Sequence, residues 1–282
     1  MTNVQNNYMK KLTIIAGNCI LEDINTSIET ADFLLKLSNQ YDYELIFKSS
    51  FKKDNRSSTD YYIGPKISDS IKIFKHLKEK FGVKIITDFN NLYELDSDIV
   101  SAVDILQLPA YLCMQTELTL KMAKTGKPIN IKKGQFLHPE DVSKIIKKIE
   151  SVGNKKIFVT ERGTCFGYRD LVVDPRSFQI LKSFGYPVFF DVGHSIRKYG
   201  VPSANLKEGG HKEFVYTLTR AAIACGIDGV FVEVHPNPPI AKCDAATQLS
   251  FKEFEKLIKE IIPIWEILNS KVYSEDEDSK HI

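Results

Sequence analysis

Short apolar runs rich in β-branched residues recur along the chain, separated by longer segments of mixed polarity. Runs of this kind, bounded by polar residues or glycine, are typical of parallel strands that are buried on both faces. The pattern therefore predicts a series of buried strands. Eight runs have this form, at residues 11–17, 43–50, 83–88, 103–110, 128–134, 155–163, 187–194 and 229–236.

Between the runs, apolar residues follow helical spacing, and several segments open on a Ser, Thr or Asp that favours a helix start. The alternation of eight strands with helices predicts a single-domain (β/α)8 TIM barrel over residues 11–271, with its active site at the carboxyl ends of the strands. An open doubly wound sheet is harder to reconcile with eight units. We expect an N-terminal extension over residues 1–10 and a polar tail over residues 272–282. The clearest helical segments are residues 26–40, 68–82, 139–153, 212–226 and 250–268.

Charge and composition narrow the class of protein. The 282-residue chain has 38 Lys and Arg against 36 Asp and Glu, and no basic stripe indicates nucleic-acid binding. No apolar run approaches the ~20 residues that span a bilayer, and the polar start lacks the apolar core of a secretory signal. We therefore expect a cytoplasmic protein without nucleic-acid or membrane partners. The five cysteines fit free thiols, or one metal ligand among them, better than a disulfide framework.

Cationic side chains gather at the ends of the predicted strands. Alternation along residues 128–134 directs Asn130 and Lys132 inward if their apolar neighbours face the helices. Cations that converge from several strands suit a small substrate with both phosphate and carboxylate groups. Taken singly, each of these lysines is as readily a solvated charge at a strand end. The candidate anion-binding residues are Lys48, Lys53, Lys132 and Arg162.

A second constellation is suited to a metal ion. It combines one cysteine and one histidine with two carboxylates, namely Cys19, His194, Glu233 and Asp244. Soft and hard donors together fit Fe²⁺, Zn²⁺ or Mn²⁺ and not Mg²⁺. The alternative is a buried thiol, a core histidine and ordinary carboxylates. The loop KKDNRSS adds Arg56, which is placed either to hold a second phosphate or to lie in solvent.

Seven ordered motifs across residues 13–250 carry a resemblance to a known family. They are AGNCILED, IFKSSFKKDNRSS, DILQLPAYLCMQTE, INIKKGQFL, TERGTCFGYRDLVVDPRS, FDVGHS and VFVEVHPNP. Together they resemble the 3-deoxy-D-manno-octulosonate 8-phosphate (Kdo8P) synthases of the metal-dependent class. The resemblance implies a (β/α)8 barrel, a homotetramer, and condensation of phosphoenolpyruvate with arabinose 5-phosphate to give Kdo8P and phosphate.

The resemblance also implies roles for individual residues. Phosphoenolpyruvate would be bound by Lys48, Lys53, Gln107, Lys132 and Arg162. The aldose phosphate would be bound by Asn55, Arg56 and Ser57, with Ser195 as a further substrate contact. The metal set would be Cys19, His194, Glu233 and Asp244, and a cysteine at position 19 favours the metal-dependent class. Catalytic roles would fall to Lys53, Asn55 and Asp244, with Lys53 transferring a proton if neighbouring cations lower its pKa.

The chain departs from the family pattern mainly around the acceptor. Met114 stands where the family has an arginine that binds the aldose phosphate across a subunit boundary. Asn90 replaces a histidine, Arg197 a glutamine and Asn18 a proline, and residues 203–210 replace a Gly/Ser-rich loop.

Three alternative functions therefore stay open. The first is a phosphoenolpyruvate-dependent synthase for another aldose, phosphorylated or not. The second is a non-catalytic barrel, and the third is a metal hydrolase, which would leave the cations unexplained.

Overall fold

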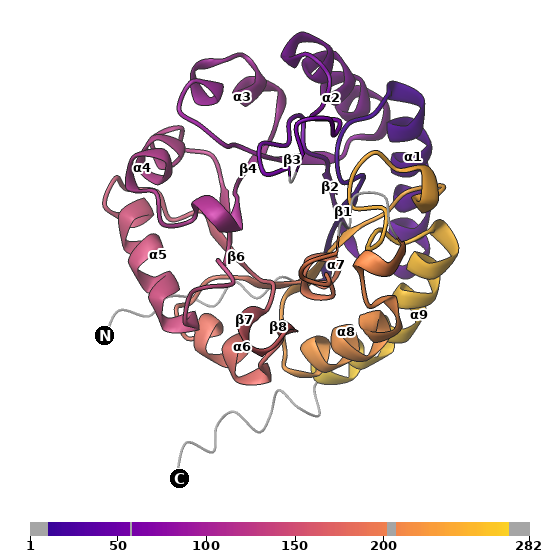
Figure 1. The fold of residues 1–282 in the computed structure, drawn as a ribbon. Coiled ribbons are helices and arrows are strands. Elements are labelled where there is room, and N and C mark those ends of the chain that lie inside the picture. Colours follow the sequence, from indigo (N-terminus) through magenta and orange to yellow (C-terminus); the bar gives the residue numbers. More distant parts are fainter. Residues whose placement is uncertain (1–10, 57, 202–206, 271–282) are drawn as a thin grey trace.

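The computed structural model describes residues 11–56, 58–201 and 207–270. In these ranges eight parallel strands close into a barrel with a ring of helices outside it (Figure 1). The predicted (β/α)8 barrel is therefore confirmed, while the proposed extension and tail lie outside the described residues. The barrel strands are β1 (Thr13–Gly17), β2 (Glu44–Lys48), β3 (Lys84–Asp88), β4 (Ile105–Leu108), β5 (Ile129–Lys132), β6 (Ile157–Glu161), β9 (Val188–Asp191) and β10 (Gly229–Glu233).

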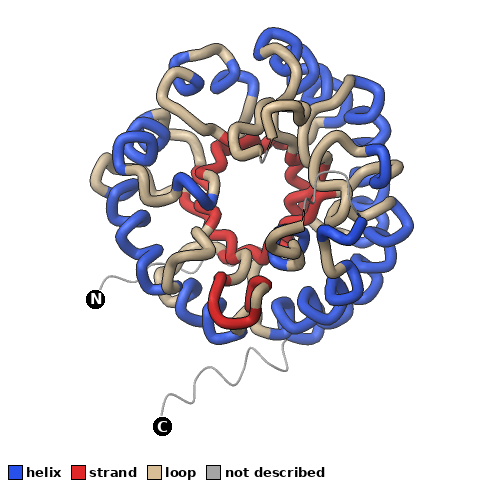
Figure 2. Tube along the Cα trace, in the orientation of Figure 1, coloured by secondary structure: helices blue, strands red, loops and turns tan. Residues whose placement is uncertain are grey.

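Helices surround the strands on their outer side (Figure 2). Their apolar faces pack on the outward-facing strand residues in one continuous core. None of the helices in the described ranges combines the length and apolar character needed to cross a membrane. The outer helices are α1 (Ile24–Tyr41), α2 (Ile67–Phe81), α3 (Ile99–Ala102), α4 (Thr116–Lys124), α5 (Val142–Glu150), α6 (Pro175–Lys182), α8 (Val215–Ala224) and α9 (Phe251–Leu268).

Alternation along the strands separates two apolar layers. In β1, Ile14 and Ala16 belong to the core shared with the helices, whereas Ile15 points into the barrel. The interior layer fills the barrel, so the polar residues of the same strands are left to line its carboxyl end. The buried residues of this interior layer are Ile15, Ile46, Ile86, Ile105, Phe189 and Phe231.

Glycine is required where β1 reaches the mouth of the barrel. Gly17 has φ +155, and a Cβ at this position would lie 2.1 Å from the carbonyl oxygen of Lys48. The missing side chain lets β1 and β2 approach, and the Lys48 ammonium then donates to the Cys19 carbonyl at 3.0 Å. On its other side Gly17 pairs with Glu233 of β10. The strands β1, β2 and β10 thereby bring Cys19, Lys48 and Glu233 together.

Two elements differ from the sequence prediction. The strand predicted over residues 187–194 ends at Asp191, because that side chain accepts from the His194 amide and begins the short helix α7 (Val192–Ser195). An antiparallel hairpin of β7 (Thr164–Tyr168) and β8 (Asp170–Val172) follows β6 and was not predicted.

Candidate active site

A pocket with about 520 Å³ of empty space, partly open to solvent, lies at the carboxyl ends of the strands. The pocket is strongly cationic, because the described residues place six lysines and arginines around it. A small, highly charged anion fits this lining better than an apolar ligand does. The residues that line it are Lys48, Lys52, Lys53, Asn55, Asp88, Asn90, Gln107, Pro109, Ala110, Tyr111, Lys132, Arg162, His194 and Arg197.

All four predicted anion-binding cations lie in this pocket. The Lys48 ammonium donates to Glu233 Oε1 at 2.7 Å, and Lys53 lies 3.9 Å from the same atom. Lys132 pairs with Asp191 and lies over the Phe231 ring, 3.4 Å from its centroid. Buried carboxylates therefore hold the three lysines in place at the strand ends.

Arg162 differs from the lysines in its partners. In the described structure its hydrogen bonds go to neutral oxygens, Gln135 Oε1 at 3.0 Å and the His194 carbonyl at 3.4 Å. Its Nε atom is buried without a hydrogen-bond partner. A planar guanidinium with unmatched charge at the pocket wall is well suited to bind a carboxylate or phosphate through two parallel hydrogen bonds.

Beneath the cations, a chain of hydrogen bonds crosses the four neighbouring strands β6, β5, β4 and β3. Thr160 donates to Asn130 Oδ1 at 2.7 Å, and Asn130 donates to Gln107 Oε1 at 2.9 Å. Gln107 in turn donates to Asp88 Oδ1 at 2.6 Å. Because Gln107 is fixed at both ends of its amide group, it presents a defined donor and acceptor pattern to the pocket. The inward direction predicted for Asn130 and Lys132 is confirmed.

Asp88, which is one of the residues that line the pocket, stays ionised. Burial acts to raise the pKa of Asp88, but the charges of Lys48 and Lys53 outweigh it and lower that pKa to about 2. Hydrogen bonds from Ser50 and Gln107 act in the same direction. The carboxylate therefore balances part of the cationic charge across the pH range in which proteins are stable.

The role predicted for Lys53 depended on neighbouring cations that lower its pKa, whereas the groups beside it act in the other direction, and the role stays a prediction. Burial acts to lower the pKa of Lys53, but Cys19, Cys243 and Glu233 together raise it well above the usual value. Lys132 behaves in the opposite way. Burial lowers the pKa of Lys132 to about 8, and the Asp191 carboxylate offsets this only in part. Among the described pocket lysines, Lys132 is the one whose pKa is lowered, which suits a group that transfers a proton.

The four predicted metal ligands meet at one edge of the pocket. Donor atoms of His194, Glu233 and Asp244 lie within 4.8 Å of one another, and Cys19 Sγ lies 3.5 Å from Asp244 Oδ2. The other ring nitrogen of His194 lies 2.9 Å from the Asp191 carboxylate, which orients the ring as carboxylates do in metal sites. Asp244 adopts a positive φ of 44°, a strained backbone conformation that is enriched at functional sites.

These residues fit a divalent transition metal. Glu233 Oε2 is buried without a hydrogen-bond partner, as expected of an atom reserved for a cation. Burial and the contact with Cys243 raise the pKa of Cys19 well above its usual value, so a bound cation is needed to favour the thiolate. A thiolate, an imidazole and two carboxylates together suit Fe²⁺, Zn²⁺ or Mn²⁺.

The remaining predicted substrate contacts lie in different places. Asn55 lines the pocket, whereas Arg56 turns away and donates to Cys243 Sγ at 2.7 Å. Ser195 is buried and donates to the Val192 carbonyl at 2.8 Å, away from the lining. Ser57 lies outside the described residues. The acceptor roles of these residues remain predictions.

Sequence reasoning also missed some residues of the site. Lys52 and Tyr111 line the pocket, as do the departures Asn90 and Arg197, so two of the family changes lie in the pocket wall. Met114 is 39% exposed and is not among the lining residues, and residues 203–206 of the altered loop lie outside the described structure. Lys52 and Tyr111 lie outside the strands, so no alternation of apolar and polar residues in the sequence shows that they face the pocket.

A closed barrel with a cationic pocket beside metal-binding donors defines an enzyme that acts on small anionic substrates. Residues 3–267 match the DAHP synthetase I family, and the chain belongs to this family. Relatives named 2-dehydro-3-deoxyphosphooctonate aldolase include one from Fusobacterium nucleatum, which is 43% identical over 92% of this chain and 92% of its own. Another, from Trichlorobacter lovleyi, is 42% identical over 89% of this chain and 91% of its own. The resemblance to the Kdo8P synthases is thereby confirmed.

Proposed function

We propose that this enzyme condenses phosphoenolpyruvate with arabinose 5-phosphate to give Kdo8P and phosphate, the reaction implied by the name of its relatives. The observation that carries the proposal is the convergence of Lys48, Lys132 and Arg162 on one pocket beside the metal-binding donors. Phosphoenolpyruvate presents a carboxylate and a phosphate within a short span, and several cations are needed to hold both.

In this reaction the methylene carbon of phosphoenolpyruvate forms a bond to the aldehyde carbon of the acceptor. Water adds at the carbon that bears the phosphate, and one proton of this water replaces the proton that the aldehyde oxygen takes up. The bond between this carbon and the phosphate oxygen then breaks, the added oxygen becomes the keto group, and its second proton leaves with the phosphate. The pocket contributes by orienting the donor and by stabilising the negative charge that builds on its oxygens. Arg162, Lys48 and Lys132 are placed to hold the carboxylate and phosphate.

Proton transfer near the reacting carbons belongs to Lys132 rather than Lys53 in this proposal. With a pKa of about 8, Lys132 can give a proton to a developing alkoxide or leaving phosphate and regain it from water at neutral pH. Lys53, with its raised pKa, stays charged and serves as a fixed cation beside Glu233.

The metal would be held by Cys19, His194, Glu233 and Asp244. When bound, a divalent ion there would polarise the acceptor aldehyde or lower the pKa of the attacking water. The Asp191 carboxylate contacts His194 Nδ1 and so leaves the other ring nitrogen, Nε2, to bind the metal. The acceptor itself would extend past Asn55 toward the loop that carries Arg56 and Ser57.

A different aldose is the second candidate acceptor, because Asn90 and Arg197 both line the pocket where the family pattern has other residues. The deciding experiment supplies metal-loaded enzyme with phosphoenolpyruvate and a panel of aldoses, including arabinose 5-phosphate and arabinose. Phosphate release that is matched by an eight-carbon keto-acid phosphate supports the proposal. Release only with another aldose favours the second candidate, and binding of phosphoenolpyruvate without any release identifies a non-catalytic barrel.

We further propose a homotetramer that works in the cytoplasm. The loops after β4 and β5 expose Tyr111, Met114 and Phe136, which are large apolar side chains of the kind buried at subunit interfaces. All five cysteines are free thiols, which suits a reducing compartment. Light scattering on the purified enzyme checks the assembly, and a monomer at micromolar concentration contradicts it.

A further inference from the structure

A second thiol lies against the proposed metal site. Cys243 Sγ lies 2.9 Å from Cys19 Sγ, and both side chains are buried and reduced. This separation exceeds the roughly 2.0 Å of a disulfide bond. Donor atoms of Cys19, Cys243 and Asp244 lie within 4.8 Å of one another, as do those of His194, Glu233 and Asp244. Asp244 is therefore shared by two candidate groups of ligands in the described structure.

The backbone around the two cysteines is built to keep them together. The buried Gln248 side chain accepts from the Cys19 amide at 3.2 Å and donates to the Cys243 carbonyl at 2.7 Å. One glutamine thus joins segments that lie more than two hundred residues apart in the sequence. Asp244, with its positive φ, accepts from the backbone amides of Thr247 and Gln248. The position of Cys243 is therefore fixed by the same turn that presents Asp244.

The charges around this cluster match a site with two thiolates. Two thiolates and two carboxylates would leave a divalent ion with an excess of negative charge, which is costly in a buried position. Lys48 lies 2.7 Å from Glu233, Arg197 lies 3.6 Å from Asp244, and Arg56 Nη1 lies 2.7 Å from Cys243 Sγ. An arginine directed at the sulfur of Cys243 has a clear purpose if that sulfur carries negative charge.

We infer that Cys243 is a second thiolate ligand, so that the metal site contains Cys19, Cys243, His194, Glu233 and Asp244. Two sulfurs make the site softer and favour Zn²⁺ or Fe²⁺ over Mn²⁺. Arg56 is then a positioning residue that balances the second thiolate. The inference rests on the proposed metal site and adds a ligand to it.

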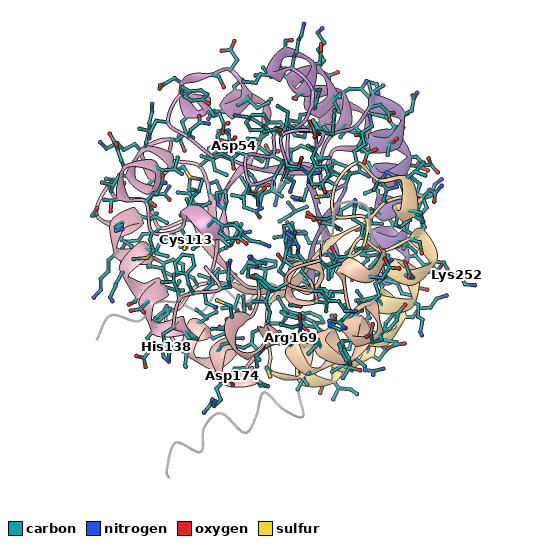
Figure 3. The ribbon with its side chains drawn as sticks, in the orientation of Figure 1. Asp54, Cys113, His138, Arg169, Asp174 and Lys252 are labelled. Atoms are coloured by element: carbon teal, nitrogen blue, oxygen red, sulfur yellow. The ribbon has the colours of Figure 1, made fainter. Side chains whose placement is uncertain are left out.

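The experiment uses the full-length enzyme reconstituted with Co²⁺, whose thiolate charge-transfer absorption in the near ultraviolet grows with each sulfur bound. Cys243→Ser is expected to lose about half of this absorption, Cys19→Ser a similar share, and the double variant all of it, since each sulfur contributes its own transition. The matched control is Cys113→Ser. Cys113 is another buried thiol, lies in the loop after β4, and is across the ring of helices from α9 (Figure 3). This variant should keep the full absorption.

The outcomes separate the inference from the proposed function. If Cys243→Ser keeps the full band while Cys19→Ser abolishes it, the inference is overturned and the four-ligand metal site stands. If neither variant changes the band, both the inference and the proposed metal site fail. X-ray absorption of the Zn²⁺-loaded wild-type enzyme gives an answer that depends on no variant: two sulfurs in the coordination shell support the inference, and one sulfur overturns it.

Discussion

Three buried lysines at the mouth of the barrel differ in how their charges are balanced. Lys48 and Lys53 share the Glu233 carboxylate, which helps to raise the pKa of each. Burial lowers the pKa of Lys132 more than the pairing with Asp191 raises it. The nearby charges of Lys48 and Arg162 lower this pKa further. Of the three, Lys132 is the one whose charge changes within the accessible pH range.

The first prediction follows from this. Lys132 is a cation below its pKa of about 8 and becomes neutral above it. A phosphate ester is already fully ionised there, since its second pKa is about 6. We expect kcat/KM for phosphoenolpyruvate to fall as the pH rises through about 8, because kcat/KM reports the free enzyme. In the complex the bound anion stabilises the cation, so the fall in kcat should occur at higher pH.

Initial rates measured across the alkaline range check this prediction, with Lys132→Arg as the comparison. Arginine stays charged, so the fall near pH 8 should vanish in this variant even if its overall rate is low. A wild-type profile that stays level until the usual lysine range of about 10.4 would refute the assignment.

The second prediction concerns Arg162. Replacing Arg162 by lysine keeps the charge and removes the planar pair of donors. We expect kcat/KM for phosphoenolpyruvate to decrease about 10- to 100-fold, from the roughly 1.5–3 kcal/mol of a hydrogen bond to a charged group. Arg176→Lys is the control, since that side chain is 86% exposed on α6. Unchanged kinetics in Arg162→Lys would remove this residue from the donor site.

At this scale the sequence predicted the direction of side chains on strands, but for side chains on loops it gave candidates without their direction. Lys48, Lys132 and Gln107 lie in strands, where alternation determines which side chains point inward. Arg56 and Cys243 lie in loops, where no period fixes direction, and their contact joins positions that are far apart in the sequence. The position of Cys243 directly before Asp244 was the one signal that could have suggested it.

Among the elements, β9 and α7 show how a single residue shapes the site. Asp191 ends β9 and caps α7 by accepting from the His194 amide at 3.0 Å. The same carboxylate holds the His194 ring and pairs with Lys132. The apolar pattern of residues 187–194 predicted one continuous strand, because a four-residue helix is too short to show a helical period. A local cap by Asp191 therefore ends the strand and begins the helix, and the same carboxylate links both to the site.

The helix α9 gives a prediction about stability. Ser250 accepts from the Glu253 amide, and Glu253 accepts from the Ser250 amide at 2.7 Å, which together form a capping box. Ser250→Ala should cost about 1 kcal/mol of unfolding free energy. A change of that size shifts the melting temperature by about 2–4 °C in domains of 150–250 residues.

Thermal unfolding of Ser250→Ala beside Ser183→Ala measures this effect. Ser183 is exposed at the carboxyl end of α6 and donates to a nearby backbone carbonyl, so its loss should change the melting temperature little. Equal shifts in the two variants would show that the capping box does not stabilise α9. The helix start was predicted at Ser250 from sequence, because capping is local and leaves a recognisable pattern.

For the whole molecule, the pairing of β1 with β10 closes the barrel, and the proposed metal ligands lie at this closure. Cys19 follows β1, whereas Glu233 ends β10 and Asp244 lies in the loop beyond it. Closure could be predicted from sequence only as a count of eight units, since no local pattern records which strands pair. An ion bound there would join residues from the two ends of the barrel sequence and would stabilise the closed barrel.

The last prediction is that removing the metal destabilises the fold as well as stopping turnover. A ligand that binds only the folded state at 100 times its dissociation constant contributes about 2.7 kcal/mol. Chelation should therefore lower the melting temperature by about 5–10 °C. Turnover should stop with it and return when Zn²⁺, Fe²⁺ or Mn²⁺ is added back. In Cys19→Ser the chelator should have little further effect, whereas Cys113→Ser should respond like the wild type. Equal melting temperatures of the wild-type enzyme with and without chelator would show that no metal links β1 to β10.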